Sequence, residues 1–174
     1  MSGVIWPESF RLEILRRSHG RRQFDCGHAL VNDWLQTKAL QHQSKRLSTT
    51  KALVDSNGAL VGFYTLATGQ VDFSDLPADL SRQLPRRALP VAVVAWLGVS
   101  VGNQGQRLGE RLFAQALRDC YDAGQTFAFV AVIVDCVDEH ARAFYQRWDF
   151  ESLPGQPFRL FLSSATLSAL MRGS

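Results

Sequence analysis

The sequence predicts an α/β fold, a mixed sheet flanked by helices, in a single domain that spans residues 1–174. A chain of this length fits one domain with a sizeable hydrophobic core. With 46% hydrophobic and 20% charged residues, its composition is that of a globular protein. Segments rich in β-branched and aromatic residues alternate along the chain with segments whose apolar residues recur at helical spacing, which favours helices packed on a sheet.

Five segments are predicted to be strands because they are rich in β-branched, aromatic and aliphatic residues and are bounded by turn-forming residues. They are Thr50–Val54, Leu60–Thr68, Val91–Val101, Phe127–Val134 and 159–162. The first two are separated by Asp55-Ser-Asn-Gly-Ala, and the Asn-Gly pair predicts an antiparallel hairpin.

The helices are predicted from apolar spacing. In Leu108–Tyr121 apolar residues recur every four positions, and in Asp138–Trp148 they follow an i, i+3, i+4, i+7 pattern. Further helices are expected at Ala29–Lys45 and at the closing segment SSATLSALMR (163–172). The polar, proline-rich segment 74–90 predicts a short helix within a long surface connection.

Composition excludes several classes of protein. No apolar run is long enough to span a membrane, and the N-terminus lacks the apolar segment of a secretion signal. Cys26, Cys120 and Cys136 show no CxxC spacing, and the histidines lack ligand spacing, so we expect neither a disulfide framework nor a metal site. A cytoplasmic protein is the simplest interpretation.

Positive charge is concentrated at the N-terminus. Residues 1–51 carry nine Lys and Arg against four Asp and Glu, a net charge of +5. The basic residues that cluster there are Arg16, Arg17, Arg21, Arg22, Lys38, Lys45 and Arg46. Such clusters attract polyanions, above all nucleic acids, although a solvated helix face would show the same charges.

The segment SVGNQGQRLGERLFAQAL (100–117) links a predicted strand to a predicted helix through a glycine-containing turn. Such a turn combines free backbone N–H groups with the positive end of the helix dipole, which together hold a phosphate. Neither GxxxxGK[ST] nor GxGxxG is present, which argues against nucleoside triphosphatases and dinucleotide-binding folds. The segment instead follows the spacing Gln-x-x-(Gly/Ala)-x-Gly, from Gln104 to Gly109, with Arg107 at the Gly/Ala position.

Four stretches, in order along the chain, carry a resemblance to a known family: FDCGHALVNDWL (24–35), GFYTLATGQV (62–71), WLGVSVGNQGQRLGERLF (96–113) and DEHARAFYQRWDF (138–150). The chain resembles the GCN5-related N-acetyltransferases, and among them the acetyltransferase toxins of bacterial toxin–antitoxin operons. The resemblance implies a mostly antiparallel sheet of that family's type. Arg107 and Asp149 depart from it, because each replaces a glycine of the family pattern.

The resemblance implies acetyl-CoA as co-substrate, with pyrophosphate on the backbone of residues 104–109 and pantetheine paired along Leu97–Val99. The residues it assigns to coenzyme binding are Leu97, Gly98, Val99, Gln104, Gly105, Gln106, Arg107, Leu108, Gly109, Glu110 and Phe144. Arg107 would present its backbone N–H like the missing glycine if its φ were negative, since only a positive φ requires glycine.

Tyr145 matches the tyrosine that protonates the departing CoA thiolate in the family, and a phenol has a suitable pKa for that task. Its place in an apolar helical stripe would equally fit a core residue. Two other interpretations of the neighbouring residues stay open: Cys136 with His140 as a nucleophile pair, and Asp135 as a substrate-side group or a simple strand-end turn.

The leading functional hypothesis is a translation-blocking toxin that acetylates the α-amino group of aminoacyl-tRNA. The resemblance also implies a ribbon-helix-helix antitoxin partner and a homodimer. One alternative keeps the enzyme but changes the acceptor to a small amine, an antibiotic or a protein amino group. Another is a non-catalytic module that binds CoA or a partner.

Overall fold

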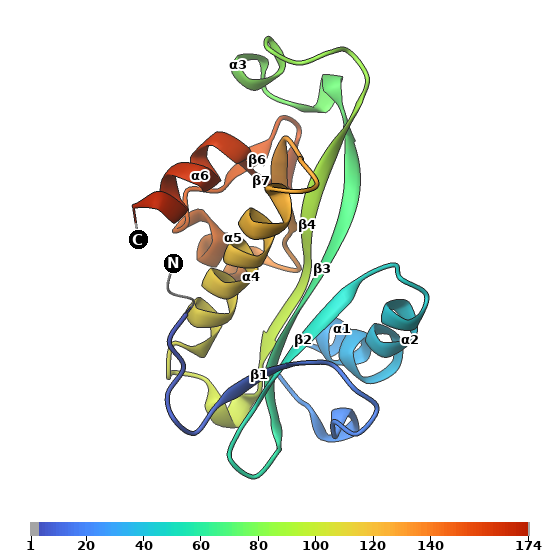
Figure 1. The fold of residues 1–174 in the computed structure, drawn as a ribbon, viewed down its shortest axis with the longest axis vertical. Coiled ribbons are helices and arrows are strands. Elements are labelled where there is room, and N and C mark those ends of the chain that lie inside the picture. Colours follow the sequence, from blue (N-terminus) through green and yellow to red (C-terminus); the bar gives the residue numbers. More distant parts are fainter. Residues whose placement is uncertain (1–3, 174) are drawn as a thin grey trace. The chain divides into compact units, whose positions relative to one another are not determined.

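Seven strands form one mixed sheet in the computed structural model, which describes residues 4–173, in the order β1-β2-β3-β4-β5-β7-β6 (Figure 1). The strands are β1 (Arg11–Ile14), β2 (Thr49–Val54), β3 (Leu60–Asp72), β4 (Ala88–Val99), β5 (Ala131–Asp135), β6 (Glu151–Leu153) and β7 (Gln156–Ser163). β4 and β5 pair in parallel, whereas β1/β2, β2/β3, β5/β7 and β6/β7 pair antiparallel. The predicted mixed, mostly antiparallel α/β fold is therefore confirmed.

The helices are α1 (Ala29–Asp33), α2 (Ala39–Ser44), α3 (Ala78–Ser81), α4 (Leu108–Gly124), α5 (Glu139–Gln146) and α6 (Ser164–Arg172). The chain divides into two compact units, Met1–Ala67 with Ala95–Arg118 and Thr68–Val94 with Asp119–Ser174. The ends of the predicted domain, residues 1–3 and 174, lie outside the described residues. No helix between residues 4 and 173 is long and apolar enough to cross a membrane.

The first unit is organised around Trp34. Its indole Nε1 donates to Thr65 Oγ1 at 3.0 Å, and Thr65 Oγ1 lies 2.7 Å from Thr50 Oγ1, so three buried polar groups satisfy one another. The indole also stacks on Trp96 with 5.3 Å between ring centroids. Leu15, Phe24, Val31, Leu35, Ala39, Ala52, Leu60 and Phe63 complete this core.

The predicted helix Ala29–Lys45 is helical to Ser44, but it is not one α-helix. Residues Trp34–Lys38 form a π-helical turn between α1 and α2. A π turn takes in one extra residue, and here it buries the adjacent Trp34 and Leu35 together. α2 packs against β2 (Figure 1), and the segment ends at Arg46, whose φ of 60° is left-handed.

In the second unit α5 and α6 pack against β7 (Figure 1). A core of this unit consists of Val71, Leu76, Leu89, Val91, Ala131, Ile133, Leu153 and Phe161. The prediction of a strand from Phe127 was wrong, because β5 begins at Ala131. The Phe127 N–H bonds to Ala123 O and continues the end of α4. Gly124 accommodates the Phe129 ring, to which an added Cβ would come within 2.9 Å.

The remaining differences concern short elements and ends. β1 and β6 were not predicted, since their four and three residues are too few to show a period. β4 stops at Val99 instead of residue 101, α4 extends to Gly124, and α5 ends at Gln146 instead of Trp148. The predicted short helix in 74–90 is α3, preceded by a 3-10 turn at Phe73–Asp75.

Thr65→Val tests the buried hydrogen-bond network of Trp34, Thr65 and Thr50. The change leaves the indole N–H of Trp34 without its buried acceptor and the Thr50 hydroxyl without its partner, so we expect a loss of about 1–3 kcal/mol in the free energy of unfolding. Urea denaturation measures it. Thr49→Val, at an exposed position on the same sheet, should change stability by less than about 0.5 kcal/mol. Equal effects of the two substitutions would refute the role given to this network.

Candidate active site

The loop between β4 and α4 is held in place by side-chain hydrogen bonds. Gln104 Nε2 donates to two carbonyl oxygens, Cys26 O and Val99 O, each at 2.9 Å. Ser100 Oγ donates to Asn103 Oδ1 at 2.7 Å, and the Val101 N–H bonds to Asp25 O at 2.8 Å. These bonds fix the loop against the end of β4 and against the segment that precedes α1.

The backbone of this loop fits an anionic group. Gly105 adopts a left-handed conformation with φ of 84°, and a Cβ added there would meet nothing within 4 Å. The i→i−4 bonds of α4 begin with Arg111 N–H to Arg107 O at 3.2 Å, so the N–H groups of Leu108 and Gly109 precede the helical ladder. Free N–H groups, a positive helix end and open space together suit the pyrophosphate that the sequence predicts here.

Arg107 stands in the conformation for which glycine is suited. Its φ is 59°, not the negative value under which an arginine would replace glycine at no cost. The left-handed region costs an L-residue about 1–2 kcal/mol. The other departure, Asp149, also has a positive φ of 66°, which aspartate tolerates better than most residues. Both substitutions therefore occupy glycine-like positions.

The predicted pantetheine segment lies beyond the parallel pairing of β4 with β5. That pairing runs from Val91 with Ala131 to Val94 with Val134, whereas Leu97–Val99 is the far end of β4. Gly98 there is closely packed, since an added Cβ would lie 3.0 Å from Val31 Cγ1 and 3.2 Å from the Phe63 ring. A strand end that continues past its neighbour needs other partners for its backbone groups, and an extended ligand can supply them.

Tyr145 lies on α5, whose N-terminus is capped by Asp138 Oδ1, which accepts a hydrogen bond from the Ala141 N–H at 2.8 Å. Only 7% of Tyr145 is exposed, and its ring packs edge-on to Phe144 at 5.2 Å. Burial, with a smaller contribution from the nearby Cys136, raises the pKa of Tyr145 well above its usual value. The phenol therefore holds its proton at neutral pH, as a proton donor must; the burial equally suits a core residue.

The alternative nucleophile pair gains no support. Burial raises the pKa of the Cys136 thiol to about 11, with Asp135 adding to the shift, so the reactive thiolate is disfavoured. His140 is exposed, and Asp135 lies at the end of β5, 3.5 Å from Arg159 Nε. Across residues 4–173, no group of three or more His, Cys, Asp or Glu side chains is arranged to hold a metal ion.

The predicted basic residues all lie in the first unit, but they differ in their contacts. Arg16 pairs with Glu13 at 2.6 Å and Lys38 with Asp33 at 3.0 Å, while Arg21 donates to Gln36 O at 3.4 Å. Arg17, Arg22, Lys45 and Arg46 are exposed, as are Arg16 and Lys38. Two of the predicted basic residues, Arg16 and Lys38, are therefore exposed but already paired with a carboxylate.

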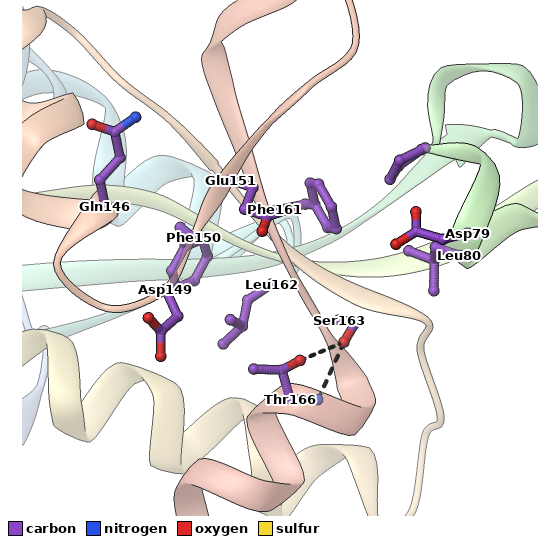
Figure 2. Close-up of a pocket in the computed structure, with 11 residues that line it drawn as sticks. Asp79, Leu80, Gln146, Asp149, Phe150, Glu151, Phe161, Leu162, Ser163 and Thr166 are labelled. Atoms are coloured by element: carbon purple, nitrogen blue, oxygen red, sulfur yellow. Dashed lines mark hydrogen bonds between the residues drawn. The ribbon is translucent and has the colours of Figure 1, made fainter.

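A cavity of about 580 Å³ lies in the second unit (Figure 2). Its lining residues are Pro77, Asp79, Leu80, Gln146, Asp149, Phe150, Glu151, Phe161, Leu162, Ser163 and Thr166. Ser163 and Thr166 bond to each other there and cap α6. None of the predicted site residues lines the cavity, and no sequence motif indicated it, since its residues come from three distant segments.

Comparison with known proteins gives consistent matches. Residues 11–150 match the acetyltransferase (GNAT) family. A tRNA-acetylating toxin of Mycobacterium tuberculosis (strain ATCC 25618 / H37Rv) is 32% identical over 148 residues, which cover 85% of this chain and 88% of that protein.

Two solved structures share the fold. AtaT complexed with acetyl-methionyl-tRNAfMet has a TM-score of 0.85 and 23% identity, with 93% of this chain and 99% of that chain covered. AtaTR bound with AcCoA has a TM-score of 0.83 and 24% identity, with 95% and 99% covered.

Arg107→Gly and Gly109→Val separate the loop's backbone strain from its ligand contacts. Arg107→Gly relieves the left-handed strain and should raise the free energy of unfolding by up to about 1 kcal/mol, with acetyl-CoA binding kept or improved. Gly109→Val should keep the fold, because its Cβ would lie 3.8 Å from Val99 Cγ2. It should still weaken acetyl-CoA binding about tenfold or more, because the side chain blocks the phosphate from the N–H groups.

Calorimetric titration with acetyl-CoA and thermal melting measure both effects. Arg46→Gly is the matched control, because it relieves a similar φ of 60° outside the loop and should raise stability without changing acetyl-CoA affinity. A large loss of affinity in Arg107→Gly would show instead that the guanidinium itself holds the ligand.

Proposed function

This chain belongs to the acetyltransferase (GNAT) family, and from that premise we propose that it transfers the acetyl group of acetyl-CoA to the α-amino group of an aminoacyl-tRNA. The observation that carries the proposal is the loop of residues 104–109, fixed by Gln104 and open to an anion at the start of α4. The acceptor is suggested by the tRNA-acetylating toxin at 32% identity.

In the proposed reaction, acetyl-CoA supplies an acetyl thioester. The loop backbone binds its pyrophosphate, and Leu97–Val99 pairs with its extended arm. The neutral α-amine attacks the carbonyl carbon, a C–N bond forms, and the C–S bond breaks. The phenol of Tyr145, which is protonated at neutral pH, gives its proton to the departing thiolate. The amine releases a proton to solvent, from which the phenolate is reprotonated.

The proposal extends to the biological setting. Acetylated aminoacyl-tRNA cannot serve as an acceptor in peptide-bond formation, so the enzyme would block translation as a cytoplasmic toxin. We propose that residues 1–174 act as one acetyltransferase domain, that the protein is a homodimer, and that a ribbon-helix-helix antitoxin neutralises it. The structure of the AtaT Y144F mutant toxin bound to the C-terminus of the antitoxin AtaR supports an antitoxin partner.

A different acceptor, a small amine or a protein amino group, is the second candidate. It is favoured because Arg16 and Lys38 are already paired with Glu13 and Asp33, which weakens the attraction of these two cations for tRNA phosphates. The two candidates differ in salt dependence. Binding of tRNA phosphates weakens steeply as salt rises, whereas binding of a small amine does not.

Tyr145→Phe tests the proton donor. Removal of the hydroxyl should slow acetyl transfer by about 10²–10⁴-fold, the range for a lost general acid. Acetyl-CoA affinity should be unchanged, because the loop of residues 104–109 is intact. Single-turnover kinetics on charged tRNA measures the rate. Tyr121→Phe, which removes a tyrosine hydroxyl on α4, is the control and should leave the rate unchanged. Turnover of Tyr145→Phe within about threefold of wild type would return Tyr145 to a purely structural role.

Charge reversal tests the basic residues. A variant with Arg17, Arg22 and Lys45 changed to Glu should lose tRNA acetylation but keep acetyl-CoA binding, because these side chains are exposed and lie outside the loop. The salt slope of tRNA binding should flatten by somewhat under about one unit for each phosphate that the variant no longer neutralises. Filter binding across a salt series measures it.

The matched control changes Arg82, Arg87 and Arg172 to Glu, which alters the net charge equally but within the second unit. Melting of both variants separates lost binding from lost stability. An equally stable N-terminal variant that acetylates charged tRNA at the wild-type rate would remove these residues from the proposed tRNA site.

A further inference from the structure

An aromatic ring and an arginine meet where β5 ends and β7 begins. Phe158 is 43% exposed and Val137 is 41% exposed, so apolar surface is accessible to a ligand there. The Cys136 N–H donates to Phe158 O at 2.8 Å, so the two segments are fixed side by side. Arg142 comes from α5 and lies on the Phe158 side of the sheet. We call Val137, Arg142 and Phe158 the Phe158 patch.

Arg142 lies between an aromatic ring and a carboxylate. Its guanidinium lies over the Phe158 ring, 5.7 Å from the ring centroid, and its Nη1 is 3.5 Å from Glu139 Oε2. The Arg142 side chain is 28% exposed. A guanidinium has five N–H donors, so its exposed part can donate to a ligand.

The Phe158 patch adjoins the proposed proton donor. Arg142 precedes Tyr145 by three residues on α5, so the two lie about one turn apart on the same side of that helix. Arg142 in turn lies over the Phe158 ring. An acceptor whose amine reacts beside Tyr145 therefore has the exposed ring of Phe158 within reach of its adjoining chemical group.

We infer that the Phe158 patch binds the terminal adenosine of the acceptor, with its base stacked on the Phe158 ring and with Arg142 donating to its phosphate. Proteins recognise unpaired nucleotides by stacking the bases on aromatic rings and guanidinium planes. The aminoacyl ester is joined to that nucleotide, so its base must bind one nucleotide's length from the reacting amine. The inference rests on the proposed function and adds the residues that distinguish an aminoacyl nucleotide from a simple amine.

The test compares two acceptors that carry the same amino acid, chosen as the one whose charged tRNA wild type acetylates fastest: the aminoacyl-adenosine and the amino-acid methyl ester. Phe158→Ala should raise KM for the aminoacyl-adenosine about tenfold, as expected for one lost base stack. It should leave turnover of the methyl ester and acetyl-CoA affinity unchanged. Phe158→Tyr should restore KM because it restores a stacking ring. Phe158→Leu keeps apolar volume without aromaticity and should behave like Phe158→Ala.

Phe127→Ala is the matched control. Phe127 is an exposed phenylalanine of the same unit, 78% accessible, and its removal should alter neither acceptor. The inference is overturned if Phe158→Ala affects both acceptors equally, if it affects neither, or if it weakens only the binding of an antitoxin. A wild-type protein that acetylates the methyl ester but no charged tRNA would instead refute the proposed function itself.

Discussion

The close approach of β3 to β4 is the constraint on which the coenzyme half of the proposed site depends. A Cβ on Gly62 would lie 2.9 Å from Leu112 Cδ1 and 3.2 Å from Gly98 O, and a Cβ on Gly98 would press on Val31 and Phe63. Gly62 and Gly98 thus allow β3, β4 and the first half of α4 to pack closely together. The buried face of α4, with Leu108 and Leu112, then fixes where its N-terminus lies. The position of the N-terminus of α4 in turn determines where the preceding loop lies.

Secondary structure was predicted correctly where the sequence pattern lay within one segment and was clear. Leu108 was predicted as the first residue of α4 because an apolar stripe begins there, and the Asn-Gly hairpin joined β2 to β3 as expected. The prediction failed where the outcome depends on distant residues. The π turn at Trp34–Lys38 and the turn at Phe127 depend on packing against residues such as Thr65 and Gly124, which no local pattern reveals.

The features of the candidate site also fall into those that the sequence could predict and those that it could not. The glycines and the segment of Tyr145 could be assigned from motifs, since their spacing is short. The left-handed φ of Arg107, the two bonds of Gln104 and the stacking of Arg142 on Phe158 could not, because each is a property of the folded backbone or joins separate segments. Charge counting was the least informative step, since several of the counted cations are bonded within the first unit.

The bond from Gln104 to Cys26 has a consequence for the order in which the protein forms. The two residues are 78 positions apart, so the loop takes its fixed shape only after a long chain closure, and such closures are slow relative to local helix formation. During synthesis, residue 26 leaves the ribosome before residue 104 does. The chain lacks the hydrogen bond between Gln104 and Cys26 until both residues are outside. The turn proposed to bind the pyrophosphate would therefore be completed late, so the proposed acetyltransferase activity would appear only when most of the chain exists.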